Sequence, residues 1–325
     1  MRRSVAGVHD VADALDQLPD GSSVVRVIEL SGFGSRRGGE AVAISPGGEV
    51  VAGRLLAGLV DGALRAHAGR TGEVRTAVTD PEAEAAGMAC GGEARLLVQP
   101  VDSVPPDAWA ALRDRRGVVV ATALDSAATR CRVDGSTPVG TTGLDDAAID
   151  QAAARLLRGG RSTVEEVDGV LLESFLPPTT VRIVGRAAVG DALAAQAELL
   201  GWRAEVVDGA EAGAGAGRVQ ASHDALVVLS HDEAVDTPSL AAALEHGRGY
   251  VGALGSRGTQ AARRARLADL GVPADRIASI HGPVGLDLGS RTPEETAVAI
   301  VAEIIAHRSG RDATSLAAGR GPING

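Results

Sequence analysis

The second half of the chain alternates short apolar runs with segments of helical spacing, and this alternation constrains the fold more than any other feature. The apolar runs cover residues 181–184, 204–207 and 225–229, and the helical segments cover residues 190–200, 238–245 and 259–270. A capping box at Thr292-Pro-Glu-Glu295 opens a further helix that runs to about residue 308. Strands that alternate with helices are typical of a parallel, doubly wound sheet. We therefore predict an α/β protein with a C-terminal Rossmann-like parallel-sheet domain over residues 179–310.

The first half has a different pattern, in which strand-like runs follow one another at short intervals. These runs cover residues 24–28, 41–44, 49–52, 94–98 and 117–122, and residues 55–67 have helical spacing. The turn signal Ser45-Pro-Gly-Gly48 indicates that two of the strands are adjacent. We predict an N-terminal mixed α/β domain over residues 1–170, a proline-containing linker at 171–178, and a flexible, Gly- and Ala-rich tail at 311–325.

Composition argues against several classes of protein. The chain has 325 residues, which suits two domains, and its net charge of −10 with only 2% aromatic residues argues against nucleic-acid binding. No apolar run reaches the roughly 18 residues that a membrane-spanning helix needs. Arg2 and Arg3 are not followed by the apolar segment of a signal peptide. The two cysteines, Cys90 and Cys131, do not make a disulfide framework, so we expect a cytoplasmic protein.

Two glycine-rich loops near the C-terminus carry chemistry that points to a ligand. The residues concerned are Gly252, Gly255, Ser256, Arg257 and Thr259 in the first loop, and His281, Gly282 and Gly285 in the second. Glycines let backbone N–H groups approach a ligand, and a helix that starts behind such a loop favours an anion. Hydroxyl and guanidinium groups add donors for phosphate. We predict that these residues bind a phosphorylated small molecule; the alternative is two tight turns and a helix cap.

A strand-turn-helix segment at residues 185–190 stands where a dinucleotide-binding fingerprint belongs. Gly185 and Gly190 are present, and Asp208 ends the next strand at the place of a ribose-binding acid. The middle glycine of the fingerprint is replaced by Ala187, whose methyl group would crowd a pyrophosphate. Two interpretations stay open: an NAD(P)-dependent oxidoreductase that uses Gly185 and Asp208, and a Rossmann-like domain without nucleotide binding.

Three further positions carry reactive side chains. Cys90 precedes two glycines whose N–H groups could stabilise a thiolate for reaction or metal binding; the alternative is a small cysteine buried in a turn. His231 and Asp232 follow a strand of the parallel sheet, where ligands of such sheets bind, and Asp236 is placed to orient the histidine. The alternative for these residues is that they cap the next turn.

Together these motifs resemble the XdhC/CoxI family, which comprises accessory proteins of xanthine dehydrogenase and carbon monoxide dehydrogenase maturation. The resemblance is close from residue 175 to residue 308, where it rests on Leu176-Pro-Pro178, Asp208, Ser230-His-Asp232, Asp236, residues 250–257, Thr259 and residues 281–287. In the first half, Val24-Val-Arg26, Gly34-Ser35 and Cys90-Gly-Gly92 are similar to the family's first domain.

The resemblance implies a chaperone of the molybdenum cofactor and not a turnover enzyme. By this resemblance the protein would bind the pterin cofactor, assist its sulfuration and deliver it to an apo-enzyme of the molybdenum hydroxylase class. Molybdopterin carries a phosphate, extended in some forms to a dinucleotide, which agrees with the two glycine-rich loops. The resemblance further implies a cysteine desulfurase as a partner, a homodimeric state, and a role for Cys90 close to the metal. His231 and Asp232 would line the cleft between the two domains.

The chain departs from the family pattern at two places. Where the family has Ser-Gly-Gly-Cys, this sequence has Leu56-Ala-Gly-Leu59, so a cysteine is replaced by Leu59. Leu59 can neither bind molybdenum nor carry sulfur, whereas a thiolate could do both. The family's Gly-Ala-Gly-His turn is Gly185-Arg-Ala-Ala188 here. These changes leave open a third interpretation, a non-catalytic scaffold that no longer handles the cofactor.

Overall fold

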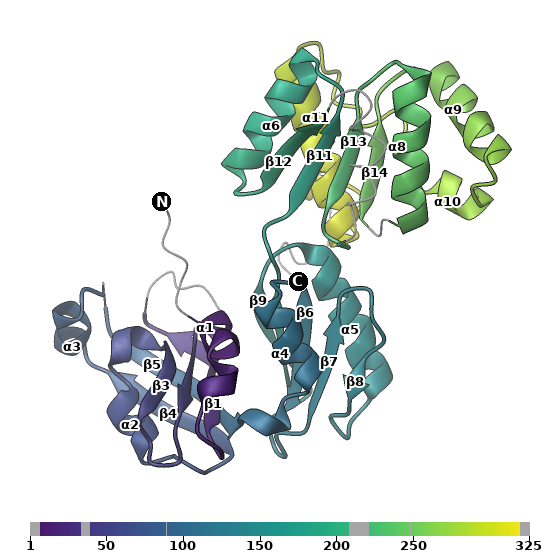
Figure 1. Ribbon diagram of the computed structural model, residues 1–325. Coiled ribbons are helices and arrows are strands. Elements are labelled where there is room, and N and C mark those ends of the chain that lie inside the picture. The colour runs from purple at the N-terminus through teal and green to yellow at the C-terminus, as the bar shows by residue number, and fades with distance from the viewer. Residues whose placement is uncertain (1–6, 34–39, 89, 208–220, 247–248, 319–325) are drawn as a thin grey trace. The chain divides into compact units, whose positions relative to one another are not determined.

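The computed structural model describes residues 7–33, 40–88, 90–207, 221–246 and 249–318, and the chain divides into two compact units (Figure 1). The first unit comprises Met1–Leu157 and Arg161–Pro177, and the second comprises Arg158–Gly160 and Pro178–Gly325. The chain finally leaves the first unit between Pro177 and Pro178, two residues that can continue neither a helix nor a central strand.

The first unit begins with a five-stranded antiparallel sheet in the order β3-β2-β1-β5-β4. Its strands are β1 Ser23–Ser31, β2 Ala41–Ile44, β3 Val50–Arg54, β4 Gly72–Val78 and β5 Gly92–Pro100; the helices around it are α1 Val8–Asp13, α2 Asp61–Arg65 and α3 Asp80–Ala85. Val25 and Leu96 pack against Leu64 of α2 on one face. Val24 on the other face packs with α1, so both faces of the central strands are buried.

A second antiparallel sheet of the first unit has the order β8-β7-β6-β10-β9. Its strands are β6 Val118–Ala123, β7 Thr129–Val133, β8 Val139–Gly140, β9 Thr163–Val167 and β10 Val170–Phe175, with helices α4 Pro106–Arg113 and α5 Asp146–Gly159. Every residue of β6 and β10 is buried. Helix α5 covers the face that carries Val119 and Leu172, and α4 covers the face that carries Val120.

A buried polar network joins the two sheets of the first unit. Arg26 of β1 pairs with Glu173 of β10 and with Gln99 of β5, and it donates a 3.0 Å hydrogen bond to Thr122 of β6. All four side chains are buried. Because removing one partner of a buried ion pair costs about 3–5 kcal/mol, this network fixes how the two sheets meet.

The strands expected in the first half are confirmed with somewhat different ends, but two other expectations are wrong. Residues 171–175 belong to β10 and not to a linker, because their apolar side chains fill the core on both faces of the sheet. The helix expected over 55–67 is interrupted. Leu56, Ala57 and Gly58 have φ values of 45°, 58° and 88°, which end any right-handed helix, and α2 begins only at Asp61.

The second unit is a four-stranded parallel sheet in the order β12-β11-β13-β14, with helices on both faces (Figure 1). Its elements are β11 Thr180–Val184, α6 Ala188–Leu199, β12 Arg203–Val207, β13 Ala225–Val228, α8 Glu233–His246, β14 Tyr250–Ala253, α9 Arg257–Asp269, α10 Ala274–Ala278 and α11 Pro293–Ser309. Helices α6 and α11 cover one face, and α8, α9 and α10 cover the other. The predicted Rossmann-like parallel sheet is confirmed.

Local differences from the sequence prediction have simple causes. Helix α8 begins at Glu233, well before Pro238, because Asp232 caps its first turn. Residues 250–253 form the buried strand β14, so the first glycine-rich segment starts as a strand and becomes a loop only at Leu254. Helix α11 begins as predicted: the hydroxyl of Thr292 accepts a 3.2 Å hydrogen bond from the N–H of Glu295.

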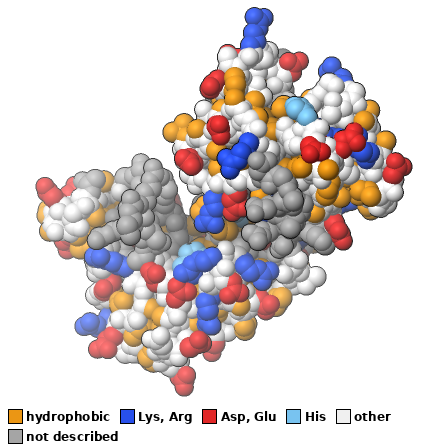
Figure 2. Space-filling model, turned by 45° about the horizontal axis from the view of Figure 1, so that its top comes forward, with side chains coloured by type: hydrophobic (Ala, Val, Ile, Leu, Met, Phe, Trp, Pro, Cys, Tyr) orange, Lys and Arg blue, Asp and Glu red, His pale blue; other side chains and the backbone are white. Residues whose placement is uncertain are grey.

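Charged side chains of both signs are intermixed over the face shown in Figure 2. This arrangement differs from the basic stripe that is typical of nucleic-acid-binding surfaces. Within the described ranges, no helix combines the length and the apolar character needed to cross a membrane.

Candidate functional site

Loops at the carboxyl ends of the parallel strands form the first candidate site. Strand β11 leads to α6 on one face of the sheet, and its neighbour β13 leads to α8 on the opposite face. Ligands of open α/β sheets bind at such a switch point, outside the carboxyl ends of the strands. The loops that meet there are residues 185–187, 229–232 and 254–256.

The loop after β14 has the features of an anion-binding site. Gly255 has a φ of 130°, and a Cβ placed on it would come within 3.1 Å of the Thr259 side chain. The hydroxyl of Ser256 caps α9: it accepts a 3.2 Å hydrogen bond from the N–H of Thr259 and lies 3.0 Å from the Thr259 hydroxyl. Arg257 is exposed, and its side chain has no partner in the described part of the chain. The loop therefore offers hydroxyl, guanidinium and helix-start N–H donors to an anion.

The loop after β13 begins α8. Ser230 Oγ accepts a 3.0 Å hydrogen bond from the N–H of Asp232, and Asp232 Oδ1 accepts a 2.9 Å bond from the N–H of Ala234. Both are capping interactions, which agrees with the alternative that Asp232 caps the turn after β13. His231 is exposed. The expectation that Asp236 orients His231 is wrong, because Asp236 is buried and holds the side chain of Arg263.

The turn after β11 offers less to an anion than the loop after β14. Gly185 has a φ of 100°, and a Cβ on it would lie 2.9 Å from the backbone nitrogen of Ser230, so packing alone requires this glycine. Ala187 has an extended backbone with φ −153°, which alanine adopts without strain. The first turn of α6 carries Asp191, whose charge opposes an anion at this helix start. Asp208, on which the NAD(P) interpretation also depends, lies outside the described residues.

The second glycine-rich loop runs beside β14, and packing explains two of the glycines in this region. His281 forms an isolated parallel bridge with Gly252. A Cβ on Gly252 would come within 2.5 Å of Val284, and one on Gly282 within 2.6 Å of Gln260. Gly252, expected to hold a ligand with its backbone, is part of a buried strand instead.

Glu303 of α11 holds this loop in place. Its carboxylate accepts a 2.6 Å hydrogen bond from the phenol of Tyr250 and a 2.7 Å bond from the N–H of Gly285, and it lies 3.1 Å from Nδ1 of His281. Burial alone would raise the pKa of Glu303, but the hydrogen bonds from His281, Tyr250 and Gly285 outweigh burial and lower this pKa below its usual value. The imidazole of His281 also stacks on Tyr250 and meets the ring of His307 edge-on, with ring centroids 4.4 and 4.9 Å apart.

Two donors expected to contact a ligand are thus engaged within the protein: the N–H of Gly285 and the side chain of His281. Glu303 was not among the predicted site residues, because it lies 22 residues after His281 and only the fold brings it to this loop.

Cys90 is half-buried and lies two residues before the start of β5. Its thiol donates a 2.7 Å hydrogen bond to the carbonyl of Gly32. The N–H of Gly91 donates a 2.9 Å bond to Oδ1 of Asp80. The N–H group of Gly91, which was expected to stabilise a thiolate, is therefore bound to the carboxylate of Asp80.

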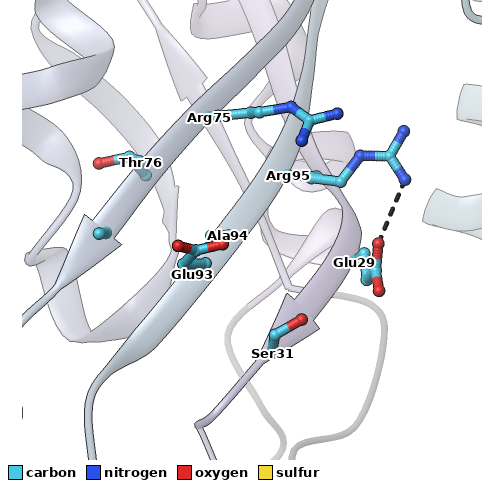
Figure 3. Close-up of a pocket in the computed structure, with 8 residues that line it drawn as sticks. Glu29, Ser31, Arg75, Thr76, Glu93, Ala94 and Arg95 are labelled. Atoms are coloured by element: carbon cyan, nitrogen blue, oxygen red, sulfur yellow. Dashed lines mark hydrogen bonds and ion pairs between the residues drawn. The ribbon is translucent and has the colours of Figure 1, made fainter.

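A polar hollow of about 610 Å³ lies on the first sheet, where it includes the start of β5 just after the Cys90-Gly-Gly92 segment (Figure 3). Arg75 of β4 and Arg95 of β5 extend along it. Arg95 pairs with Glu73 at 2.8 Å and with Glu29 at 3.2 Å, so its charge is neutralised. Arg75 also contacts Glu73 at 2.8 Å, but its side chain is 74% exposed. Arg75 is therefore the cation of this hollow that a ligand could reach.

In the described part of the chain, no group of three or more His, Cys, Asp and Glu side chains is arranged to hold a metal ion. The metal role expected for Cys90 therefore stays a prediction, and it would need the other ligands to come from a bound cofactor.

The parallel sheet and the helices on both of its faces define the second unit as a Rossmann-like domain. Residues 181–304 match the family model of the XdhC Rossmann domain. The resemblance to the XdhC family is thus confirmed for this part of the chain.

Three further proteins are similar to the chain. The molybdenum cofactor insertion chaperone PaoD of Escherichia coli (strain K12) is 33% identical over 135 residues, which are 41% of this chain and 42% of PaoD. The protein YqeB of the same organism is 27% identical over 238 residues, which are 62% of this chain and 43% of YqeB. The chain therefore spans less than half the length of these two curated relatives. A solved structure described as a xanthine dehydrogenase from Bacillus halodurans covers 94% of this chain and 97% of its own, with 19% identity and a TM-score of 0.43.

Proposed function

We propose that the protein binds the molybdenum cofactor at the loops of its second unit and assists its insertion into a molybdenum hydroxylase of the xanthine dehydrogenase or carbon monoxide dehydrogenase type. One observation carries this proposal. The segment that matches the XdhC Rossmann domain contains the glycine-rich loop after β14, whose exposed arginine, Arg257, has no partner in the described part of the chain. The similarity to PaoD, whose name describes it as an insertion chaperone, supports the same role.

The loop after β14 fits the phosphate that molybdopterin carries. Ser256 and Thr259 supply hydroxyl groups, and Arg257 can form two parallel hydrogen bonds to a phosphate. The first turn of α9 has no acidic residue, whereas the first turn of α6 has Asp191. An anion is therefore more stable at the start of α9 than at the start of α6. A dinucleotide form of the cofactor would extend from this loop, whereas the β11 turn does not favour NAD(P).

In this role the chain itself would bind the cofactor, orient it and release it to the hydroxylase. When bound, the cofactor supplies the molybdenum centre that the hydroxylase needs. Arg257 and the two hydroxyl groups would hold the phosphate, and exposed His231 would lie at the neighbouring strand end. We do not assign a turnover reaction to these residues, because the described site contains no oriented acid-base pair at this edge of the sheet: Asp232 and Asp236 are used in capping and in the contact with Arg263.

Assistance with sulfuration would depend on Cys90, because Leu59 replaces the other cysteine expected from the family pattern. The thiol of Cys90 would attack the outer sulfur of a persulfide on a cysteine desulfurase, so that Cys90 becomes a persulfide and the desulfurase cysteine leaves as a thiol. Mass spectrometry of the protein after incubation with desulfurase and cysteine would detect the added sulfur atom. If Cys90 never gains sulfur under these conditions, the sulfuration role is excluded and insertion alone remains.

Cofactor content is the decisive measurement. The protein would be purified from cells that make molybdenum cofactor, and its molybdenum and oxidised pterin fluorescence would be determined together with the activity of a co-expressed molybdenum hydroxylase. We expect pterin in the wild type and its loss in Arg257→Ala. Arg264→Ala is the matched control, because Arg264 is an exposed arginine on the same helix α9. A wild-type protein without pterin and without effect on the hydroxylase would leave only the scaffold interpretation.

A further inference from the structure

Arg263 of α9 is an arginine with almost no exposure, and its guanidinium connects three separate segments of the second unit. The residue is 1% exposed. Nε donates a 3.0 Å hydrogen bond to Oδ2 of Asp236 on α8, and Nη2 donates a 3.0 Å bond to the carbonyl of Ser230. Nη1 donates to the carbonyl of Leu254. One side chain thus binds a helix and two loop carbonyls.

The two carbonyls belong to the loops that form the first candidate site. Ser230 stands directly before His231, and Leu254 stands directly before Gly255. A Cβ on Gly255 would lie 3.4 Å from Nη1 of Arg263, so the backbone of the anion-binding loop rests on the guanidinium. The distance between the two loops is therefore set by the span of one planar side chain.

Packing alone does not explain the ion pair between Asp236 and Arg263. Both side chains are buried, at 3% and 2% exposure. Apolar residues of similar volume commonly stabilise a protein as well as a buried ion pair does. Moreover, Oδ2 of Asp236 accepts both bonds from Arg263, while Oδ1 has no hydrogen-bond partner in the described part of the chain. A buried acceptor that is left unpaired is unfavourable for folding, so this arrangement is not the one that stability alone would favour.

We propose that Asp236 and Arg263 are positioning residues: they form an ionic clamp that fixes the spacing of loops 229–232 and 254–256 for ligand binding. The identity of the ligand rests on the proposed function, whereas the clamp itself concerns only the geometry of the two loops. Neither residue needs to contact the ligand, since each acts through the backbone of Ser230, Leu254 and Gly255.

The pair Glu233–Arg266 provides a matched control. It connects the same two helices, with Nη1 of Arg266 2.8 Å from Oε1 of Glu233. Its side chains are 70% and 28% exposed, and its hydrogen bonds reach no loop carbonyl. Removing this pair takes the same number of charges from α8 and α9 but leaves the clamp intact.

The test compares three proteins with the wild type: the double variant Asp236→Leu/Arg263→Met, the single variant Arg263→Lys, and the control Glu233→Gln/Arg266→Gln. The double variant replaces the ion pair by apolar side chains, so we expect it to fold with an unfolding temperature close to that of the wild type. Hydrogen exchange in both loops should become faster, and copurified pterin should fall by about tenfold or more, because small errors in the placement of binding groups are costly. Arg263→Lys keeps the positive charge but not the planar guanidinium, so its loss of copurified pterin should be intermediate between the wild type and the double variant. The control should match the wild type.

Hydrogen exchange decides the proposal independently of the ligand. If the wild type carries no pterin, the proposed function fails, but faster exchange in both loops of the double variant would still support the clamp. If the double variant does not fold, Arg263→Lys is compared with the control by the same two measurements. If a folded variant without the guanidinium of Arg263 exchanges hydrogen in both loops as slowly as the wild type does, the proposal is overturned.

Discussion

The phenol of Tyr250, in the strand β14, donates a 2.6 Å hydrogen bond to the carboxylate of Glu303 in the helix α11. The same carboxylate binds the N–H of Gly285 at 2.7 Å, so one charged group connects the edge strand, the second glycine-rich loop and the helix that covers them. Since hydrogen bonds to charged groups are stronger than neutral ones, we regard Glu303 as a main determinant of this loop's position.

Glu303→Gln should destabilise the second unit in a pH-dependent way. The pKa of Glu303 is lowered in the folded state, so its stabilisation is fully present above the usual value of 4.5 and is lost as the pH falls through the lowered pKa. Near pH 7 the variant should lose about 1–2 kcal/mol of the free energy of unfolding. Near pH 3 the loss should be smaller, because the wild-type carboxylate is then being protonated.

Urea unfolding at these two pH values would measure the difference, followed by the fluorescence of Trp202 in a Trp109→Phe background, because Trp202 is the tryptophan of the second unit. Glu294→Gln is the control: Glu294 is an exposed carboxylate on the same helix, and its side chain has no partner in the described part of the chain. An equal loss at both pH values would contradict the charged role of Glu303.

Tyr250 should not ionise while the protein is folded. Burial and the neighbouring carboxylate of Glu303 both raise the pKa of this phenol far above its usual value. Because Tyr250 is the chain's only tyrosine, the ultraviolet absorbance of tyrosinate reports it alone. We expect no tyrosinate near pH 10, where a free tyrosine is half-ionised, until alkali unfolds the protein. Glu303→Gln should lower the pKa of Tyr250 only in part, since burial remains. If Tyr250 of the folded wild type ionises near pH 10, the prediction is refuted.

The two cysteines should differ sharply in reactivity. Cys131 is 2% exposed, and burial raises its pKa to about 11, so little thiolate is present near pH 8. Cys90 is half-buried, and its thiol donates to the carbonyl of Gly32 at the surface. Iodoacetamide should therefore modify Cys90 and leave Cys131 intact, as peptide mass spectrometry would show. Both cysteines should react in the unfolded protein. Equal rates of modification in the folded protein would contradict the burial of Cys131 in β7.

Much of the second unit could be predicted because its sequence signals are local. Apolar runs predicted β11, β12 and β13, and Thr292 predicted the start of α11 from its own spacing to Glu295. In the first unit, β4, β7 and β9 were not predicted, because charged residues such as Arg75, Arg132 and Glu165 interrupt their apolar pattern, and pairing with β5, β6 and β10 holds these segments as strands. Residues 171–175 belong to the buried strand β10, although the prolines that follow them are typical of a linker.

The candidate site could be predicted only where its residues contact near neighbours in the sequence. The first glycine-rich loop was predicted to bind a phosphorylated ligand, with a helix cap as the alternative, and the structure shows that Ser256 does cap α9 by accepting from Thr259. Arg263 and Glu303 act over longer distances, so the glycine loops did not reveal them. One signal was available: Arg263 stands four residues before Leu267, on the buried face of α9, where a charged side chain needs a partner.

Gly92→Ala should destabilise the first unit severely, whereas Gly62→Ala should not. A Cβ on Gly92 would lie 2.0 Å from the carbonyl oxygen of Ser31 and 3.0 Å from Phe33, and backbone of paired strands cannot move aside cheaply. We expect a loss of more than about 3 kcal/mol in the free energy of unfolding. Gly62 lies in α2 with no atom within 4 Å of its added Cβ, so alanine there should stabilise by about 0.5–1 kcal/mol. Urea unfolding followed by the fluorescence of Trp109 would compare the two variants. A Gly92→Ala protein as stable as the wild type would contradict the conclusion that the packing of β5 against β1 requires this glycine.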